Sequence, residues 1–165
     1  MRIVWSLEDG IAEYDGRYIS ITCDVRNELN GRRLLSEKPC YNLEADGKKG
    51  PPVMPRPFPK GIWIVVGVFP RKDPYLAPQF ISTDAKDLVD EWTEVDGHYG
   101  EKTGRQVWSY GYGLHNSRSA TTLGCGRIGG TLDGETEFST KERKELAAAI
   151  MEEWRVGRGV ILQVL

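Results

Sequence analysis

The chain has 165 residues, of which 39% are hydrophobic, and this suits one globular domain with a sizeable core. Its 22 basic and 24 acidic side chains give a formal net charge of −2 without a basic stripe, which argues against a nucleic-acid-binding protein. No run approaches the ~20 apolar residues of a membrane-spanning helix. The 19 glycines and 9 prolines favour a turn-rich, mostly β fold over a helical bundle.

The N-terminal third is predicted to hold two strands and a long loop. Residues 2–6 and 17–25 alternate apolar and polar side chains, as half-buried strands do, and an Asp15-Gly16 turn precedes the second. Residues 28–59 contain turn residues and five prolines between Pro51 and Pro59, so they are unsuited to a central strand. We predict a loop there, and long ordered loops are often functional.

The rest of the chain is predicted to hold three strands and two helices. The strands are residues 61–69, which are central, 106–112, and 159–165, which are buried. The first helix spans residues 83–95, with apolar residues Leu88, Val89, Trp92 and Val95 on one face. The second spans residues 139–155, with Ser139 or Thr140 as N-cap and Gly157 as its stop.

The chemistry is concentrated between residues 110 and 128. One of only two histidines, His115, stands ten residues before Cys125, one of only three cysteines. The cysteine is flanked by Gly124 and Gly126, and Arg127 follows. A thiol, an imidazole, exposed backbone amides and a fixed cation are the groups needed for acyl transfer through a thioester.

We assign Cys125 as the nucleophile and His115 as the general base, which then protonates the leaving amine. The backbone N–H groups of Gly124 and Cys125 are the candidate oxyanion hole. The alternative is a buried cysteine and a hydrogen-bonded histidine in a glycine-rich β turn. The TLGCGR run at 122–127 and the entry into the predicted strand at 61–69 favour the catalytic interpretation over this alternative.

Four further residues are candidates for substrate contacts. Arg127 can hold a carboxylate in a bidentate fork, and its alternative is a solvated surface arginine. Asn116 or a backbone carbonyl orients His115. Tyr112 either walls the pocket or packs in the core. The hydroxyl of Thr122 can bond a backbone group or the thiolate.

The segment resembles the signature of the L,D-transpeptidase (YkuD-like) family, which is a histidine followed by Ser/Thr-x-Gly-Cys-x-Arg/Asn. Here these are His115 and the TLGCGR run at 122–127. Upstream, GPPVMPRPFPKGIWIV at 50–65 is similar to the family's proline-rich lead into a core strand. The short His-to-Cys spacing is most similar to L,D-transpeptidase-like effectors of type VI secretion. The resemblance implies one domain, with a strand-rich lead-in at 1–49 and a catalytic core at 50–165.

The resemblance implies a mostly β sandwich or partly closed barrel with one or two peripheral helices, and it implies no cofactor. The implied substrates are peptidoglycan tetrapeptide stems, from which Cys125 would release D-Ala as it forms a thioester. Water, a D-amino acid or another stem would then resolve the acyl-enzyme. The short chain favours hydrolysis or exchange, as in an antibacterial effector.

The implied substrate lies in the periplasm or cell wall, whereas the N-terminal MRIVWSLEDG lacks the apolar stretch of a signal peptide. We therefore expect either a mature form or delivery by a specialised secretion route, with action inside the cell as the third option. An effector would also have a cognate immunity protein or a secretion carrier as partner.

Two other functions stay open from the sequence. One is a binding or structural module on the same fold that has lost catalysis, which is favoured by Leu123 and Gly126, where the family usually has His and Ile or Val. The other is a cytoplasmic cysteine hydrolase for a different acyl substrate. Alkylation of Cys125 well below pH 8 would separate an activated thiolate from an inert thiol.

The remaining cysteines and histidine are assigned structural roles. Cys23 and Cys40 are interpreted as two small core thiols, although they could pair in an oxidising compartment. His98 lies in a glycine-containing turn and is predicted to be on the surface. Two histidines without a spaced cysteine pair do not suggest a metal site, which needs three or four converging ligands.

Overall fold

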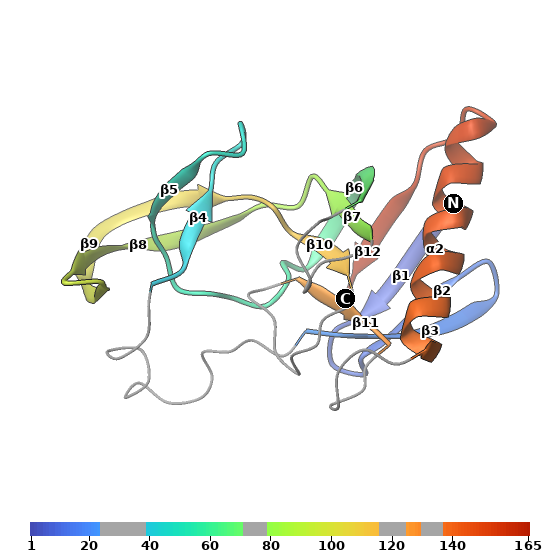
Figure 1. Ribbon diagram of the computed structural model, residues 1–165, viewed down its shortest axis with the longest axis horizontal. Helices are drawn as coiled ribbons and strands as arrows, with labels where there is room; N and C mark the ends of the chain where they lie inside the picture. Colours follow the sequence, from blue (N-terminus) through green and yellow to red (C-terminus); the bar gives the residue numbers. More distant parts are fainter. Residues whose placement is uncertain (24–38, 71–78, 116–124, 130–136) are drawn as a thin grey trace.

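The computed structural model describes residues 1–23, 39–70, 79–115, 125–129 and 137–165, and it is mostly β, as predicted (Figure 1). Eight strands close into a barrel in the order β1-β12-β6-β7-β10-β11-β3-β2. Their bounds are β1 Arg2–Ser6, β2 Ile11–Tyr14, β3 Arg17–Thr22, β6 Gly61–Pro70, β7 Gln79–Thr83, β10 Gly113–His115, β11 Gly126–Ile128 and β12 Ile161–Val164.

The predicted strands at 2–6, 61–69 and 159–165 are confirmed as β1, β6 and β12. The strand predicted at 17–25 is β3, which ends at Thr22, while residues 24 and 25 lie outside the described ranges. The Asp15-Gly16 turn is also confirmed. Both residues have positive φ (48° and 71°), which is the conformation of a two-residue hairpin turn between twisted strands. Three barrel strands thus come from the first 49 residues.

The hydrophobic core is formed by buried side chains of the barrel strands together with side chains of one helix. The helix, α2, spans Glu137–Arg155, and its Leu146 and Ile150 belong to the same buried cluster as Trp5. Trp5 is fully buried, and its indole N–H donates a hydrogen bond of 2.8 Å to the carbonyl of Ile21. Among the described residues, no helix is long and apolar enough to cross a membrane.

The C-terminus of α2 is where the sequence predicts it, but its N-terminus is not. Gly157 has φ +78°, and the amides of Gly157 and Arg158 donate to the carbonyls of Trp154 and Glu153. These two bonds form a Schellman motif, which confirms Gly157 as the stop. The prediction that Ser139 or Thr140 caps the helix is wrong, because α2 already begins at Glu137.

Two antiparallel hairpins extend beside the barrel (Figure 1). The long one joins β8 Asp87–Val95 to β9 His98–Ser109, and the short one joins β4 Tyr41–Leu43 to β5 Lys49–Pro52. A β-bridge between Val53 and Glu91 links the two. Of the segment 28–59, the structure describes residues 39–59, and these contribute no strand to the barrel. The prediction of a loop is wrong for part of this range, because β4 and β5 pair within it.

The predicted helix at 83–95 is wrong, because this segment contains strand β8. Val89 is buried and pairs with Val107, whereas Leu88 and Val95 are exposed. Trp92 packs edge-on against Tyr99 of β9, with ring centroids 5.9 Å apart. The helix-like spacing therefore reflects apolar residues on two faces of a strand. The strand predicted at 106–112 is the end of β9, which stops at Ser109.

Candidate functional site

The motif histidine and arginine lie on neighbouring parallel strands. In the pairing of β10 with β11, Leu114 lies opposite Gly126 and His115 lies opposite Arg127. Leu114 is fully buried in the barrel core. Because side chains alternate along a strand, His115 and Arg127 project from the other face of the sheet. Cys125 immediately precedes β11, one side-chain repeat before Arg127.

Gly126 is required by the packing beneath the motif. A Cβ at this position would lie 2.5 Å from a methyl carbon of Leu114 and 2.8 Å from atoms of both Ile21 and Trp5. These distances are shorter than real Cβ contacts, so the space of a side chain is already occupied by the core. The glycine thus lets β11 approach the barrel interior and fixes the depth of the neighbouring Cys125.

His115 is held in a buried, partly aromatic environment. Its side chain is only 5% exposed, and its ring stacks on Phe80 of β7 with centroids 5.8 Å apart and an interplanar angle of 23°. The Phe80 ring covers Gly113, where a Cβ would lie 2.4 Å from the ring. The imidazole plane is therefore set by a rigid neighbour on the adjacent strand.

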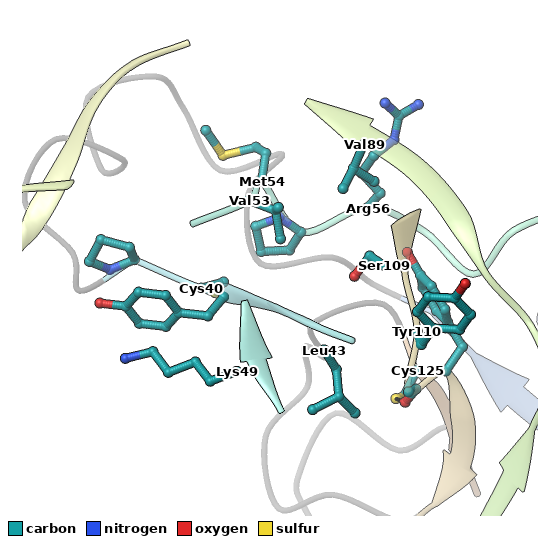
Figure 2. Close-up of a pocket in the computed structure, with 15 residues that line it drawn as sticks. Cys40, Leu43, Lys49, Val53, Met54, Arg56, Val89, Ser109, Tyr110 and Cys125 are labelled. Carbon is teal, nitrogen blue, oxygen red and sulfur yellow. Dashed lines mark hydrogen bonds between the residues drawn. The ribbon is translucent and has the colours of Figure 1, made fainter. Parts of the chain in front are cut away.

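Cys125 opens onto a cleft of about 610 Å³ between the barrel and the hairpins (Figure 2). Its thiol donates a hydrogen bond to the carbonyl oxygen of Gly111, with Sγ and O 3.7 Å apart. Gly111 has φ +86°, and a Cβ there would lie 2.5 Å from Leu43. A glycine is therefore needed at 111 both for the turn and for the close approach of β4.

Hydrogen bonds join the short hairpin and its flanking residues, which form the far wall of the cleft, to β9 and the residue that follows it. The hydroxyl of Tyr99 accepts from the amide of Cys40 at 2.8 Å and donates to the carbonyl of Val53 at 2.7 Å. The side-chain amide of Asn42 donates to the carbonyl of Trp108, and the backbone amide of Tyr110 donates to that of Leu43. The cleft thus has two ordered walls, with the thiol at one end.

Tyr112 lines the same cleft as the thiol and also packs in the core. It is 7% exposed, and its ring meets Phe58 edge-on at 5.4 Å. Burial, reinforced by the negative charges of Asp87 and Cys125, raises the pKa of Tyr112 far above its ordinary value, while Arg56 opposes the shift. Its hydroxyl consequently stays protonated near the nucleophile.

The other predicted site residues fall in three groups. Cys125 and Tyr112 line the cleft, whereas His115 and Arg127 are buried and are not among its lining residues. Arg127 is 3% exposed, so the surface-arginine alternative is excluded. The remaining candidates, Asn116, Thr122 and Gly124, lie outside the described ranges.

The structure adds two cleft residues that sequence reasoning missed, Arg56 and Lys49. The only signal for them was their place in the long segment expected to be functional. Among the described residues, no cluster of three or more His, Cys, Asp or Glu could hold a metal ion.

The residues assigned to structural roles are distributed over the fold. Cys23 packs partly buried against the core, and its sulfur accepts a hydrogen bond from the amide of Phe58 at 3.3 Å. Cys40 instead lines the cleft and is partly buried. His98 is exposed at the start of β9, as predicted.

Neither a family model, nor a curated protein, nor a solved structure matches the chain. The function of the protein is therefore inferred from the residues of the cleft and of strands β10 and β11.

Proposed function

We propose that the protein is a cysteine-dependent L,D-transpeptidase or L,D-carboxypeptidase that acts on the tetrapeptide stems of peptidoglycan. One observation carries the proposal. The thiol of Cys125 opens onto a cleft of about 610 Å³, and the strand that follows Cys125 pairs with the strand that ends in His115. The resemblance of the TLGCGR run at 122–127 to the family signature points to the same chemistry.

The reaction begins with attack of the Cys125 thiolate on the carbonyl carbon of the bond between the L-centre and D-Ala. A C–S bond forms and the C–N bond breaks, while the imidazolium of His115 gives the proton taken from the thiol to the leaving amine of D-Ala. The thioester is then attacked by water, a D-amino acid or the amine of another stem. His115 removes the nucleophile's proton, and the thiol is restored.

The shape and lining of the cleft fit a peptide donor. The lining includes the apolar run of Val53, Met54 and Pro55 together with Tyr110 and Tyr112. Such a surface contacts the apolar parts of a peptide while backbone groups remain available for hydrogen bonds. The proposal includes action in the periplasm or cell wall, with delivery as an antibacterial effector and a cognate immunity protein that covers the cleft.

The test is digestion of purified tetrapeptide muropeptides, analysed by mass spectrometry. We expect loss of D-Ala, exchange for an added D-amino acid or a new dimer with the wild type, and none of these with Cys125→Ala or His115→Ala. Cys23→Ala, which removes a thiol outside the cleft, is the matched control and should keep activity. Unchanged muropeptides with folded wild-type protein would reject the peptidoglycan assignment.

A second measurement distinguishes the open alternatives. Alkylation of the three cysteines by iodoacetamide at pH 7 is followed on their separate peptides. Fast, His115-dependent labelling of Cys125 without muropeptide activity would indicate a cysteine hydrolase for another acyl substrate. Slow labelling of Cys125, no faster than that of Cys23, would instead indicate a module without catalysis.

A further inference from the structure

The cleft beside Cys125 has a one-sided charge. Two basic side chains, Arg56 and Lys49, are among the described residues that line it, and no acidic side chain is. They lie at different places around the cleft in Figure 2, with Arg56 on the side of Val89 and Lys49 on the side of Cys40. A cleft of this charge favours an anionic ligand.

We infer that Arg56 binds a carboxylate of the acyl donor and so orients the donor over Cys125. This inference rests on the proposed function and specifies its substrate contact. It moves the carboxylate contact from Arg127, which is 3% exposed and not among the lining residues, to an arginine that solvent and ligands can reach.

The geometry of Arg56 suits this role. Its side chain is 51% exposed, and its Nε lies 3.6 Å from a carboxylate oxygen of Asp87. Within the described part of the chain, this is the one ion pair of Arg56, and its terminal nitrogens bond no other side chain. The contact from Asp87 restrains the side chain, while the guanidinium keeps donors for a bidentate carboxylate.

Arg56 and Tyr112 line the same cleft as Cys125. A donor carboxylate held by Arg56 would therefore lie in the cavity onto which the Cys125 thiol opens. Lys49 is less suited to the role, because its ammonium already lies 3.5 Å from the centre of the Tyr41 ring.

The first test needs no peptidoglycan. Cys125 is alkylated with iodoacetate, which carries a carboxylate, and with neutral iodoacetamide of similar size, and the rates are compared on the Cys125 peptide. We expect Arg56→Gln to lower the ratio of the iodoacetate rate to the iodoacetamide rate several-fold. Arg105→Gln is the matched control, because Arg105 is an exposed arginine paired with Glu91 away from the cleft. An unchanged ratio in Arg56→Gln would overturn the inference.

The second test uses three tetrapeptide donors: one with free carboxylates, one amidated at the C-terminus and one amidated at the side-chain carboxylate of the L-centre residue. We expect Arg56→Gln to lower kcat/KM for the free donor about tenfold or more, and Arg56→Lys to recover part of the loss. The effect of the substitution should vanish with one amidated donor, which identifies the carboxylate. An equal loss with all three donors would contradict the inference.

The outcomes distinguish a failure of the proposed function from a failure of the role assigned to Arg56. If wild-type protein does not process muropeptides, the proposed function fails, but the alkylation ratio still decides whether Arg56 attracts a carboxylate to Cys125. If muropeptides are processed and Arg56→Gln behaves as the wild type in both tests, the proposed function holds and the role of Arg56 is rejected.

Discussion

His115 and Arg127 lie opposite each other on the adjacent parallel strands β10 and β11, and both are almost completely buried. Their side chains project from the sheet face opposite Leu114 and Gly126, whereas Cys125 and Tyr112 line the cleft. The His115 imidazole and the Arg127 guanidinium are thus positioned by the same pair of hydrogen-bonded strands. The arrangement implies that Arg127 contributes to the rigidity of the site whether or not it contacts a substrate.

We predict that Arg127→Gln destabilises the protein, whereas Arg56→Gln does not. The Arg127 side chain is 3% exposed, so its replacement disturbs buried polar contacts and should lower the free energy of unfolding by about 1–3 kcal/mol. Arg56 is half exposed, and its change should stay within about 0.5 kcal/mol. Urea denaturation followed by circular dichroism measures both. A wild-type midpoint for Arg127→Gln would show that the buried arginine is dispensable to the fold.

We predict that Gly126→Val destabilises the barrel by overpacking, by about 1–3 kcal/mol or more. The added Cβ would overlap Leu114, Ile21 and Trp5, and the strand would have to move outward with Cys125. The midpoint of urea denaturation should fall, and the rate at which iodoacetamide labels Cys125 should change with it.

The double variant Gly126→Val/Leu114→Ala tests the reason for this loss. Removing the closest side chain opens space for the new one, so the two changes should cost less together than the sum of their separate effects. Additive losses would mean that the clash with Leu114 is not the cause.

The barrel strands and the C-terminal helix could be predicted because their signals are local. The strands β1, β3, β6 and β12 show alternating or continuous apolar residues bounded by turn residues, and Gly157 supplies the left-handed residue that ends α2. The His115 and Cys125 pair was found for the same reason, since both residues lie in one short segment. Their placement on paired strands depends on tertiary structure, which the spacing alone does not give.

The cleft could not be predicted, because its walls come from distant parts of the chain. Val53 and Arg56 line the cleft together with Tyr112 and Cys125, and hydrogen bonds of Tyr99 and Asn42 join the short hairpin to β9. The same long-range pairing overrides the helix-like spacing at 83–95. In isolation that segment has an apolar helical face, but β9 offers a full set of strand partners.

We predict that Glu153 makes stability depend on pH in the acid range. Hydrogen bonds from Arg158, together with the amino group of Met1, lower the pKa of the Glu153 carboxyl from 4.5 to about 2. Because the folded state favours the charged form, this contribution is complete above about pH 4.5 and is lost as the pH falls towards 2.

Stability profiles between pH 2 and pH 6 provide the measurement. Glu153→Gln should be less stable than the wild type at pH 6, and the difference should shrink towards pH 2. Glu145→Gln, at an exposed position of the same helix, is the control and should keep the slope of the wild type. A constant difference between Glu153→Gln and the wild type over the whole range would contradict the prediction.

We predict that Tyr99→Phe loosens the cleft wall and lowers activity. The buried hydroxyl accepts from the amide of Cys40 and donates to the carbonyl of Val53, so its removal leaves two buried backbone groups without this partner. Such a loss costs about 1–3 kcal/mol. Because Cys40 and Val53 both line the cleft, the segment that carries Arg56 should become less well ordered.

Hydrogen exchange of the peptide covering residues 39–56 measures this effect directly, alongside kcat/KM for a tetrapeptide donor. Faster exchange in that peptide, with the barrel strands unchanged, is the expected result. Tyr18→Phe is the control, because Tyr18 is 70% exposed on barrel strand β3 and is not among the residues that line the cleft. If the exchange of residues 39–56 stays at the wild-type rate, the wall is held by the remaining bonds of Asn42 and Tyr110, and the Tyr99 hydroxyl contributes only to local packing.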